Sequence, residues 1–316
     1  MTSVQIAPRL PSQQSRGASV ALGLFDGVHV GHAAVIRQAV QAAGGELVPC
    51  VFTFELRETV PDSKNQYSEL LTPRQKQARL YSLGVQQILS VPFEQVKNLT
   101  GQEFFEQILL ERMHARILCC GDDFRFGRGA QCSVLQLRQL CENAGVRLMV
   151  LPKIQRDGGI VSSTRIRLAV RRGEMGLARD LLGVPFTLEF EVVHGRRLGR
   201  QLGAPTLNQR FPANFTVPRF GVYASIARIG DKAYPAVTNV GIKPTVGSAE
   251  VLAETHAVGF SGDLYGKLIP VELLEFLREE RKFGNLEELT RQIRQDAQRA
   301  VELVGDWEGA PAAFRG

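Results

Sequence analysis

The first half of the chain alternates short apolar runs with amphipathic stretches, and this rhythm limits its fold more than any other feature of the sequence. The apolar runs lie at residues 19–24, 47–54, 87–91, 116–120 and 146–151. Strands that alternate with helices favour a parallel sheet covered by helices. We therefore expect an α/β domain with a Rossmann-like parallel sheet.

Helix boundary signals fit between the apolar runs. Thr72 precedes Pro73, Thr100 and Glu103 have the spacing of a capping box, and Gly145 follows an amphipathic stretch at residues 133–144. Each is a local signal for where a helix begins or ends.

The hydrophobic period changes after residues 183–186. Leu188, Phe190 and Val192 alternate with polar residues, which is the period-two pattern of a half-buried strand. Further strands are expected near residues 221–229, 233–240, 254–260 and 267–276, followed by a helix over residues 285–304 that Asn285 and Glu288 would cap. This pattern predicts a small antiparallel β-barrel with a terminal helix.

A chain of 316 residues exceeds the usual size of one domain. We expect a flexible leader at residues 1–17, a first domain at 18–182, a linker at 183–186, a second domain at 187–306 and a tail at 307–316.

Composition narrows the class of protein. There is no apolar run long enough to span a membrane, and the first sixteen residues lack the apolar core of a secretory signal. The five cysteines lack C-x-x-C spacing, which favours a reducing cytoplasm over a metal cluster. The net charge of +6 is scattered, so we expect anionic small molecules as ligands, with neither nucleic acid nor membrane as a partner, in a monomer or weak homo-oligomer.

A histidine motif follows the first expected strand. The segment from Gly23 to His32 reads G-L-F-D-G-V-H-V-G-H and leads into a helix that we expect to open at Ala33. Backbone N–H groups at a helix N-terminus bind anions, and His29 and His32 could donate hydrogen bonds to phosphates. Taken alone, such a motif is more often two ordinary loop histidines.

A hydroxyl cluster opens another expected helix. Ser162, Ser163 and Thr164 are followed by Arg167, which together could form a second phosphate cradle. A plain Ser/Thr N-cap would explain one of these hydroxyls but not the cluster.

The second domain opens with a glycine- and arginine-rich loop at residues 195–203. Such a loop suits a phosphate tail, although it is more often a solvated turn. Thr206 and Asn208 follow it and offer oxygen ligands of the kind that Mg²⁺ accepts. Taken by itself, Glu254 on an expected strand would be a solvated carboxylate.

These motifs together resemble one family. The segment from Phe25 to His32, Thr53-Phe54, residues 121–127 and residues 161–167 resemble the FMN adenylyltransferase module of bacterial riboflavin kinase/FAD synthetases. Residues 205–208, 221–223, 239–245, 254–256, 263–266 and 281–283 resemble the riboflavin kinase module in its order. The resemblance implies phosphorylation of riboflavin by ATP and Mg²⁺ to FMN, and then transfer of AMP from ATP to give FAD and pyrophosphate.

The resemblance also implies site residues. The catalytic residues would be Glu254, His29, His32 and Arg167; ATP would bind Gly23, Phe25, Asp26, Gly27, Gly31, Ser162, Ser163, Thr164, Gly195, Arg200, Gly203 and Pro205; the flavin would bind Asp123, Phe124, Asn239, Gly241, Pro244, Thr245 and Arg281; and Thr206 and Asn208 would hold the metal.

Two segments depart from the family pattern. The family commonly has Pro-His-Pro after Thr53-Phe54, where this chain has Glu55-Leu-Arg, and Gly127 is followed by Arg128 instead of Gly-Asp. A riboflavin kinase with a weak or regulatory adenylylation domain is therefore an alternative. An RNA-binding protein built on an H-x-G-H fold is another, against which the lack of clustered basic or aromatic segments counts.

Overall fold

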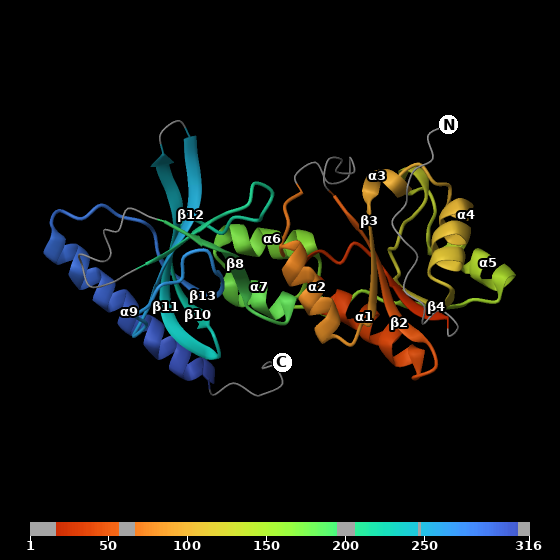
Figure 1. Cartoon of the computed structure of the whole chain (residues 1–316), viewed down its shortest axis with the longest axis horizontal. Helices are drawn as coiled ribbons and strands as arrows, with labels where there is room; N and C mark the ends of the chain where they lie inside the picture. Colours follow the sequence, from red (N-terminus) through yellow and green to blue (C-terminus); the bar gives the residue numbers. More distant parts are fainter. Residues whose placement is uncertain (1–16, 57–66, 195–205, 246–247, 309–316) are drawn as a thin grey trace. The chain divides into compact units, whose positions relative to one another are not determined.

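The computed structural model describes residues 17–56, 67–194, 206–245 and 248–308, and the chain divides into two compact units (Figure 1). The first unit contains the residues up to Tyr67 together with Pro73–Ser162. The second contains Ser68–Thr72 and everything from Ser163 onwards. The helices after Ser162 therefore group with the barrel, and the linker expected at residues 183–186 lies inside the second unit. The assignment of functional domains stays a prediction.

The first unit is built on a parallel sheet of five strands, as the sequence predicted. The strands are β1 (Ala18–Leu22), β2 (Val48–Glu55), β3 (Gln87–Pro92), β4 (Ala115–Gly121) and β5 (Arg147–Leu151), in the order β3-β2-β1-β4-β5. The order reverses between β1 and β4, because β2 and β3 extend the sheet on one side and β4 and β5 on the other. In parallel sheets, ligands bind outside the carboxyl ends of the strands at such a switch point.

Helices connect these strands. They are α1 (Val30–Ala43), α2 (Pro73–Ser82), α3 (Phe93–Val96), α4 (Gly101–Glu103) with the π-helical continuation η3 (Phe104–Arg112), and α5 (Val134–Ala144). Short elements complete the unit: η1 (Asp26–Val28), η4 (Arg128–Ala130) and the hairpin β6 (Gln155–Arg156) and β7 (Gly159–Ile160).

The expected caps are present at three of these helices. Thr100 and Glu103 form a complete capping box, α2 begins at Pro73, and Gly145 ends α5 in the left-handed conformation. The expectation that a helix opens at Ala33 was wrong, because α1 begins at Val30 with His29 as its N-cap. His32 therefore lies in the first helical turn.

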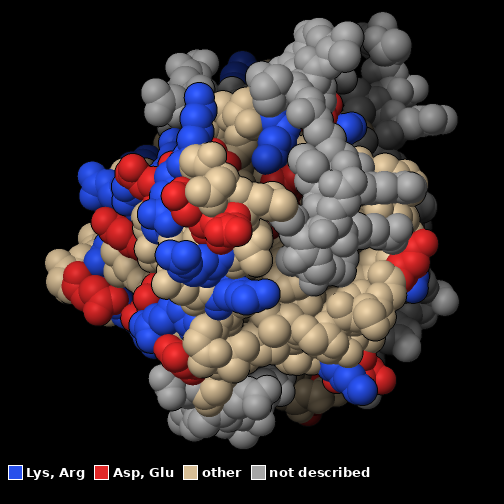
Figure 2. Space-filling view, turned by 90° about the vertical axis from the view of Figure 1, so that its left-hand side faces the viewer, with Lys and Arg blue, Asp and Glu red and all other residues tan. Residues whose placement is uncertain are grey.

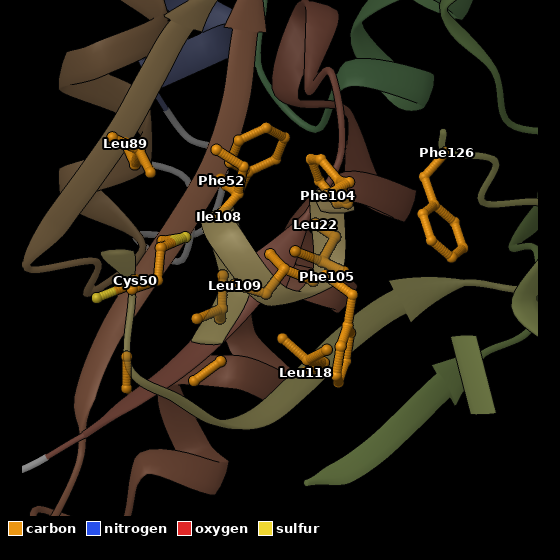
Figure 3. Close-up of a cluster of buried hydrophobic side chains, with 14 of the residues drawn as sticks. Leu22, Cys50, Phe52, Leu89, Phe104, Phe105, Ile108, Leu109, Leu118 and Phe126 are labelled. Carbon is orange, nitrogen blue, oxygen red and sulfur yellow. The ribbon is translucent and has the colours of Figure 1, made fainter. Parts of the chain in front are cut away.

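An apolar core fills one side of the sheet (Figure 3). Side chains from β1, β2 and β4, including Leu22, Phe52 and Leu118, pack against Phe105 and Leu109 of η3. Each such fully buried side chain contributes about 1.5–3 kcal/mol. The helix at residues 101–112 is thus held by packing.

The cysteines behave as small core residues. All five are free and four are buried, and burial raises the pKa of Cys50 to about 12. The buried thiols are therefore protonated at neutral pH, which suits packing better than metal binding.

The second unit begins with two helices and closes into a barrel, as predicted. Helices α6 (Ser163–Arg172) and α7 (Met175–Leu182) precede β8 (Phe186–Val193), β9 (Leu207–Arg210), β10 (Gly221–Ile229), β11 (Lys232–Thr245), β12 (Ser248–Ala257) and β13 (Leu268–Arg278). The strands close in the order β10-β11-β12-β9-β8-β13, and α9 (Leu286–Glu308) packs against β10 and β11. Strand β9 and the first half of β12 were not expected.

Alternation along the strands separates the interior of the barrel from its outer face. Thr238 and Thr255 are fully buried, and the Thr238 hydroxyl bonds both the Thr255 hydroxyl and the Ser225 hydroxyl. Asn239, which follows Thr238, and Glu254, which precedes Thr255, are only half-buried and face outward. Both residues were predicted from the sequence to take part in the second site, so the candidate residues of this site lie on the outer face of the barrel.

The surface of the molecule on the side of α9 mixes both signs of charge (Figure 2). On α9 itself, Arg299 forms ion pairs with Glu302 and with Glu275 of β13. On this face, positive side chains are interspersed with negative ones instead of forming a stripe.

Candidate active sites

The first candidate site lies where β1 and β4 end, at the reversal of strand order. The histidine motif follows β1, and residues 121–124 follow β4. The sequence motifs are thus delivered to the edge at which parallel sheets bind ligands.

The turn between β1 and α1 is tightly wound. Phe25 (φ 52°), Gly27 (φ 77°) and Val28 (φ 39°) all adopt left-handed backbone conformations, and Phe25 is anchored by burial. At Gly31 the reason for glycine is space, because a Cβ there would lie 3.2 Å from the His29 ring. Gly27 therefore serves the turn, and Gly31 makes room for the imidazole.

The two histidines are held against each other at the start of α1. Their rings stack with centroids 3.5 Å apart, and the backbone N–H of His32 donates to His29 Nδ1 at 3.2 Å. Burial, and then the charge of Arg79, lower the pKa of His29 to about 4. His29 is thus neutral at physiological pH, and because Nδ1 accepts a hydrogen bond, its proton sits on Nε2 as a donor.

Helix α2 brings two cations that the sequence analysis missed. Lys76 Nζ donates to Leu24 O at 2.6 Å and to Thr53 Oγ1 at 2.8 Å, and Thr53 in turn donates to Leu24 O at 2.9 Å. Arg79 lies three residues further along the same helix face and close enough to His29 to lower its pKa. The i, i+3 spacing of two cations after the Pro73 start was the signal that could have found them.

Residues after β4 approach the same site. Asp123 forms an exposed ion pair with Lys153 at 3.1 Å, and its charge opposes the lowering of the His29 pKa. Phe124 stacks on Phe126, with ring centroids 5.8 Å apart. The first unit therefore gathers His29, His32 and Asp123 as predicted, and adds Lys76 and Arg79.

The hydroxyl cluster is divided between the units. Ser162 ends the first unit, whereas Ser163, Thr164 and Arg167 begin α6 of the second. Arg167 Nε donates to Ser68 O at 2.6 Å and so helps to hold residues 68–72. Their proposed role toward ATP stays a prediction.

The second candidate site is a row of side chains across the outer face of the barrel. Asn208 of β9 pairs in register with Glu254 of β12, and Glu254 pairs in register with Asn239 of β11. Residues directly opposite on adjacent strands have Cβ atoms about 5 Å apart. Three residues chosen from separate motifs thus form one continuous row.

Two charged residues border this row. Lys243 Nζ lies 2.8 Å from Glu254 Oε2, and Glu280 Oε1 accepts a hydrogen bond from Asn239 Nδ2 at 2.7 Å. The sequence analysis included Lys243 in the motif at residues 239–245 but gave it no role, and it did not select Glu280. No local spacing points to Glu280, because it approaches the row from the segment after β13.

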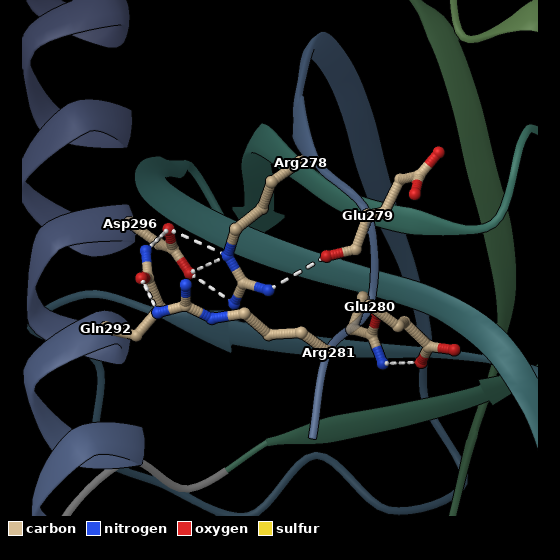
Figure 4. Close-up of polar contacts among 7 residues, drawn as sticks. Arg278, Glu279, Glu280, Arg281, Gln292 and Asp296 are labelled. Atoms are coloured by element: carbon tan, nitrogen blue, oxygen red, sulfur yellow. Dashed lines mark hydrogen bonds and ion pairs between the residues drawn. The ribbon is translucent and has the colours of Figure 1, made fainter. Parts of the chain in front are cut away.

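Arg281 is held by the terminal helix (Figure 4). It donates to Gln292 Oε1 of α9, and its guanidinium lies over the Phe283 ring at 4.8 Å. Nearby, Arg278 and buried Asp296 form an ion pair with Nη2–Oδ2 at 2.7 Å. The segment after β13 is thus tied to α9 on both sides of Glu280.

Several predicted residues have less structural description. Gly195, Arg200, Gly203 and Pro205 lie outside the described residues. Pro244 and Thr245 are described only as backbone, pairing with Ala249 and Ser248 in β12. Their predicted roles rest on the resemblance alone.

The oxygen groups near the row fit a hard divalent cation beside phosphate. Asn208 is buried with its Nδ2 donating to Thr206 O at 3.4 Å, and the Glu254 carboxylate lies on the neighbouring strand. Hydroxyl, amide and carboxylate oxygens are the ligands such cations take. Among the described side chains no group of three His, Cys, Asp or Glu residues is arranged to hold a metal by itself.

Fold and sites together define a two-unit enzyme that handles nucleotides, with a nucleotidyltransferase-type α/β unit and a small barrel. The comparisons with known proteins agree: a family model described as FAD synthetase matches residues 11–165, and one described as riboflavin kinase matches residues 182–304. The chain belongs to the bifunctional riboflavin kinase/FMN adenylyltransferase family, and is a transferase with both activities.

Relatives from two bacteria carry that description. The Pseudomonas fluorescens protein is 35% identical over 314 residues, covering 96% of each chain, and the Escherichia coli K12 protein is 35% identical over 301 residues, covering 94% of this chain and 96% of its own. A crystal structure from Streptococcus pneumoniae, described as a macrolide-efflux protein, has a TM-score of 0.79 at 31% identity, covering 90% of this chain and 94% of that one.

The family assignment supports the bifunctional interpretation over both alternatives, the kinase with a weak adenylylation domain and the RNA-binding protein. Within the described part of the chain, every helix is too short or too polar to cross a bilayer.

Proposed function

We propose that His29 and His32 carry the adenylyl step in the first unit and that Glu254 is the base of the kinase step in the second. The observation that supports this most is the convergence of motif residues within each unit: a stacked histidine pair at a helix start, and the row of Asn208, Glu254 and Asn239.

In the adenylyl step, a phosphate oxygen of FMN attacks the α-phosphorus of ATP and pyrophosphate leaves. The neutral His29 would donate from Nε2 to the phosphate chain, and the N–H groups at the start of α1 would add to this. Lys76 and Arg79 would offset repulsion between two anions. Because FMN itself is the nucleophile, no covalent enzyme intermediate is needed.

In the kinase step, the 5′-hydroxyl of riboflavin attacks the γ-phosphorus of ATP and ADP leaves. Glu254 would accept the hydroxyl proton, and Lys243 at 2.8 Å from Oε2 would hold the carboxylate in place. Thr206 and Asn208 would hold Mg²⁺, which supplies charge neutralisation at the phosphates. Asn239, Gly241 and Arg281 would bind the flavin.

We further propose a cytoplasmic location, which suits five free cysteines of which four are buried. ATP, riboflavin and FMN are the partners that follow from the two activities. A monomer or weak homo-oligomer, without nucleic acid or membrane partners, remains our expectation.

The test is to incubate the purified protein with riboflavin, ATP and Mg²⁺ and to separate the flavins by chromatography over time. FMN should appear first and FAD should follow. In a His29→Gln, His32→Gln variant, FMN should still form while FAD formation is lost. FMN without FAD in the wild type would show that the altered segments after Phe54 and Gly127 have cost the adenylyl step, and FAD formation by the double variant would rule out the histidine roles.

A further inference from the structure

The segment after β13 brings one carboxylate onto the row of side chains in the barrel unit. Glu280 Oε1 accepts a hydrogen bond from Asn239 Nδ2 at 2.7 Å, and Asn239 lies directly opposite Glu254 in the β11–β12 register. Glu280 therefore touches the row at the neighbour of the proposed base.

This contact determines which way the Asn239 amide points. An ionised carboxylate only accepts hydrogen bonds, so it binds the NH₂ group and excludes the carbonyl oxygen. Asn239 Oδ1 is consequently turned away from Glu280, where it is buried and meets no hydrogen-bond donor among the described residues. A buried carbonyl oxygen without a hydrogen-bond donor is unfavourable. The Asn239 amide keeps this orientation because Glu280 accepts a hydrogen bond from its NH₂ group.

Gly241 provides the space that Glu280 occupies. It lies on the same outward face as Asn239, and a Cβ at this position would come within 2.5 Å of Glu280 Oε1 and 2.9 Å of its Cδ. The carboxylate thus packs against bare backbone, which fixes its position from a second side.

The segment that carries Glu280 is anchored to α9 on both sides. Arg278 is paired with Asp296 at 2.7 Å, and Arg281 donates to Gln292. The neighbouring Glu279 instead pairs with Arg219 at 2.6 Å and does not take part in the row. The two adjacent carboxylates are therefore used differently.

We propose that Glu280 is a positioning residue of the riboflavin kinase site, which fixes the orientation of the Asn239 amide beside Glu254. The inference rests on the proposed role of this row in riboflavin binding. Because Asn239 is placed to bind substrate and not to transfer a proton, loss of Glu280 should weaken riboflavin binding more than it slows the chemical step.

The experiment measures KM and kcat for riboflavin in Glu280→Ala, Glu280→Gln, Gly241→Ala and the Gly241→Ala, Glu280→Ala double variant. Glu280→Ala should raise KM about tenfold with kcat changed less than about twofold. Glu280→Gln keeps an acceptor oxygen and should stay within about threefold of the wild type. Gly241→Ala displaces the carboxylate, so it should raise KM in the wild type and add little in the Glu280→Ala background.

Two controls separate positioning from general damage. Glu279→Ala removes the adjacent carboxylate and should leave KM unchanged. Adenylylation of supplied FMN takes place in the other unit and should be equal in all variants. A kcat for FMN formation close to that of the wild type shows that the barrel unit of each variant is folded.

The outcomes are distinct. A wild-type KM in Glu280→Ala, an equal loss in Glu279→Ala, or full additivity of Gly241→Ala and Glu280→Ala would overturn the inference. Failure of the wild type itself to form FMN would instead overturn the kinase assignment.

Discussion

His29 links the stability of the first unit to pH. Its ordinary pKa of 6.5 applies to the unfolded chain, whereas burial and Arg79 lower the pKa in the folded protein to about 4. Between these values the unfolded state binds the proton and the folded state does not, so the free energy of unfolding falls as pH is lowered through this window. Above pH 6.5 this penalty is absent.

We expect the wild type to lose about 2 kcal/mol more than a His29→Gln variant when pH is lowered from about 7 to about 5. Urea unfolding of both proteins at the two pH values measures this. Other titrating groups contribute equally to both chains, so the comparison isolates His29. Parallel losses would show that the imidazole titrates normally.

Lys76 ties helix α2 to the turn before the histidine motif. A Lys76→Met change keeps the aliphatic stem but removes the hydrogen bonds to Leu24 O and Thr53 Oγ1. We expect kcat/KM for FMN adenylylation to fall about tenfold to a hundredfold, because misplaced catalytic groups cost that much. Riboflavin phosphorylation should be unchanged.

Lys97→Met, a change just after α3, is the matched control for Lys76→Met and should leave both steps intact. An unaltered adenylylation rate in the Lys76 variant would show that the turn holds its shape without the lysine.

Motifs selected the candidate residues for chemistry but not the residues that hold them in place. His29, His32 and Glu254 stand in segments whose residue types and spacing indicate phosphate chemistry. Lys76 approaches Thr53 from a helix, and Glu280 approaches Asn239 from the segment after another strand. Such contacts depend on tertiary packing, which neither local spacing nor hydrophobic period encodes.

Apolar period located most elements. The five runs of the first half became the five parallel strands within a few residues. Strand β9 was missed because it is polar: Asn208 faces the outer row, and fully buried Gln209 donates to Phe190 O and Ile269 O inside the barrel. A strand whose inward residue is satisfied by distant carbonyls has no alternating apolar pattern to detect.

A largely buried ion pair joins the terminal helix to the end of β13. Asp296 accepts from Arg278 through both carboxylate oxygens and from Gln292, and it is only 6% exposed. Removing one partner leaves the other charge buried without compensation. We expect Asp296→Ala to lower the free energy of unfolding of the barrel unit by roughly 3 kcal/mol, measured by urea unfolding followed with circular dichroism.

Glu302→Ala provides the contrast on the same helix, because it removes only exposed contacts, the ion pair with Arg299 and a hydrogen bond from Gln298. Its effect should stay within about 0.5 kcal/mol. Similar losses in both variants would mean that helix propensity, and not the buried pair, holds α9.

At the scale of the whole molecule, the sequence indicated two domains and their order, and the chain forms two compact units. Hydrophobic period alone does not show which unit a helix packs against. Helices α6 and α7 have the amphipathic pattern of the first half, yet α7 packs against β8 and β13 of the barrel. Which sheet a helix covers depends on its partners and not on its own pattern.

Separate sites for the two steps predict that they can be supplied by different molecules. A His29→Gln chain should make FMN but no FAD, and a Glu254→Gln chain should make FAD from supplied FMN but no FMN from riboflavin. Mixed in equal amounts, the two chains should convert riboflavin to FAD, because FMN released by one barrel can diffuse to the first unit of the other chain.

Flavin chromatography over time measures the recovery of FAD formation, with each variant alone as the control. FAD should appear after a lag that shortens as protein concentration rises, since the intermediate must first accumulate in solution. A mixture that accumulates FMN and yet forms no FAD would mean that FMN must be handed over within one chain.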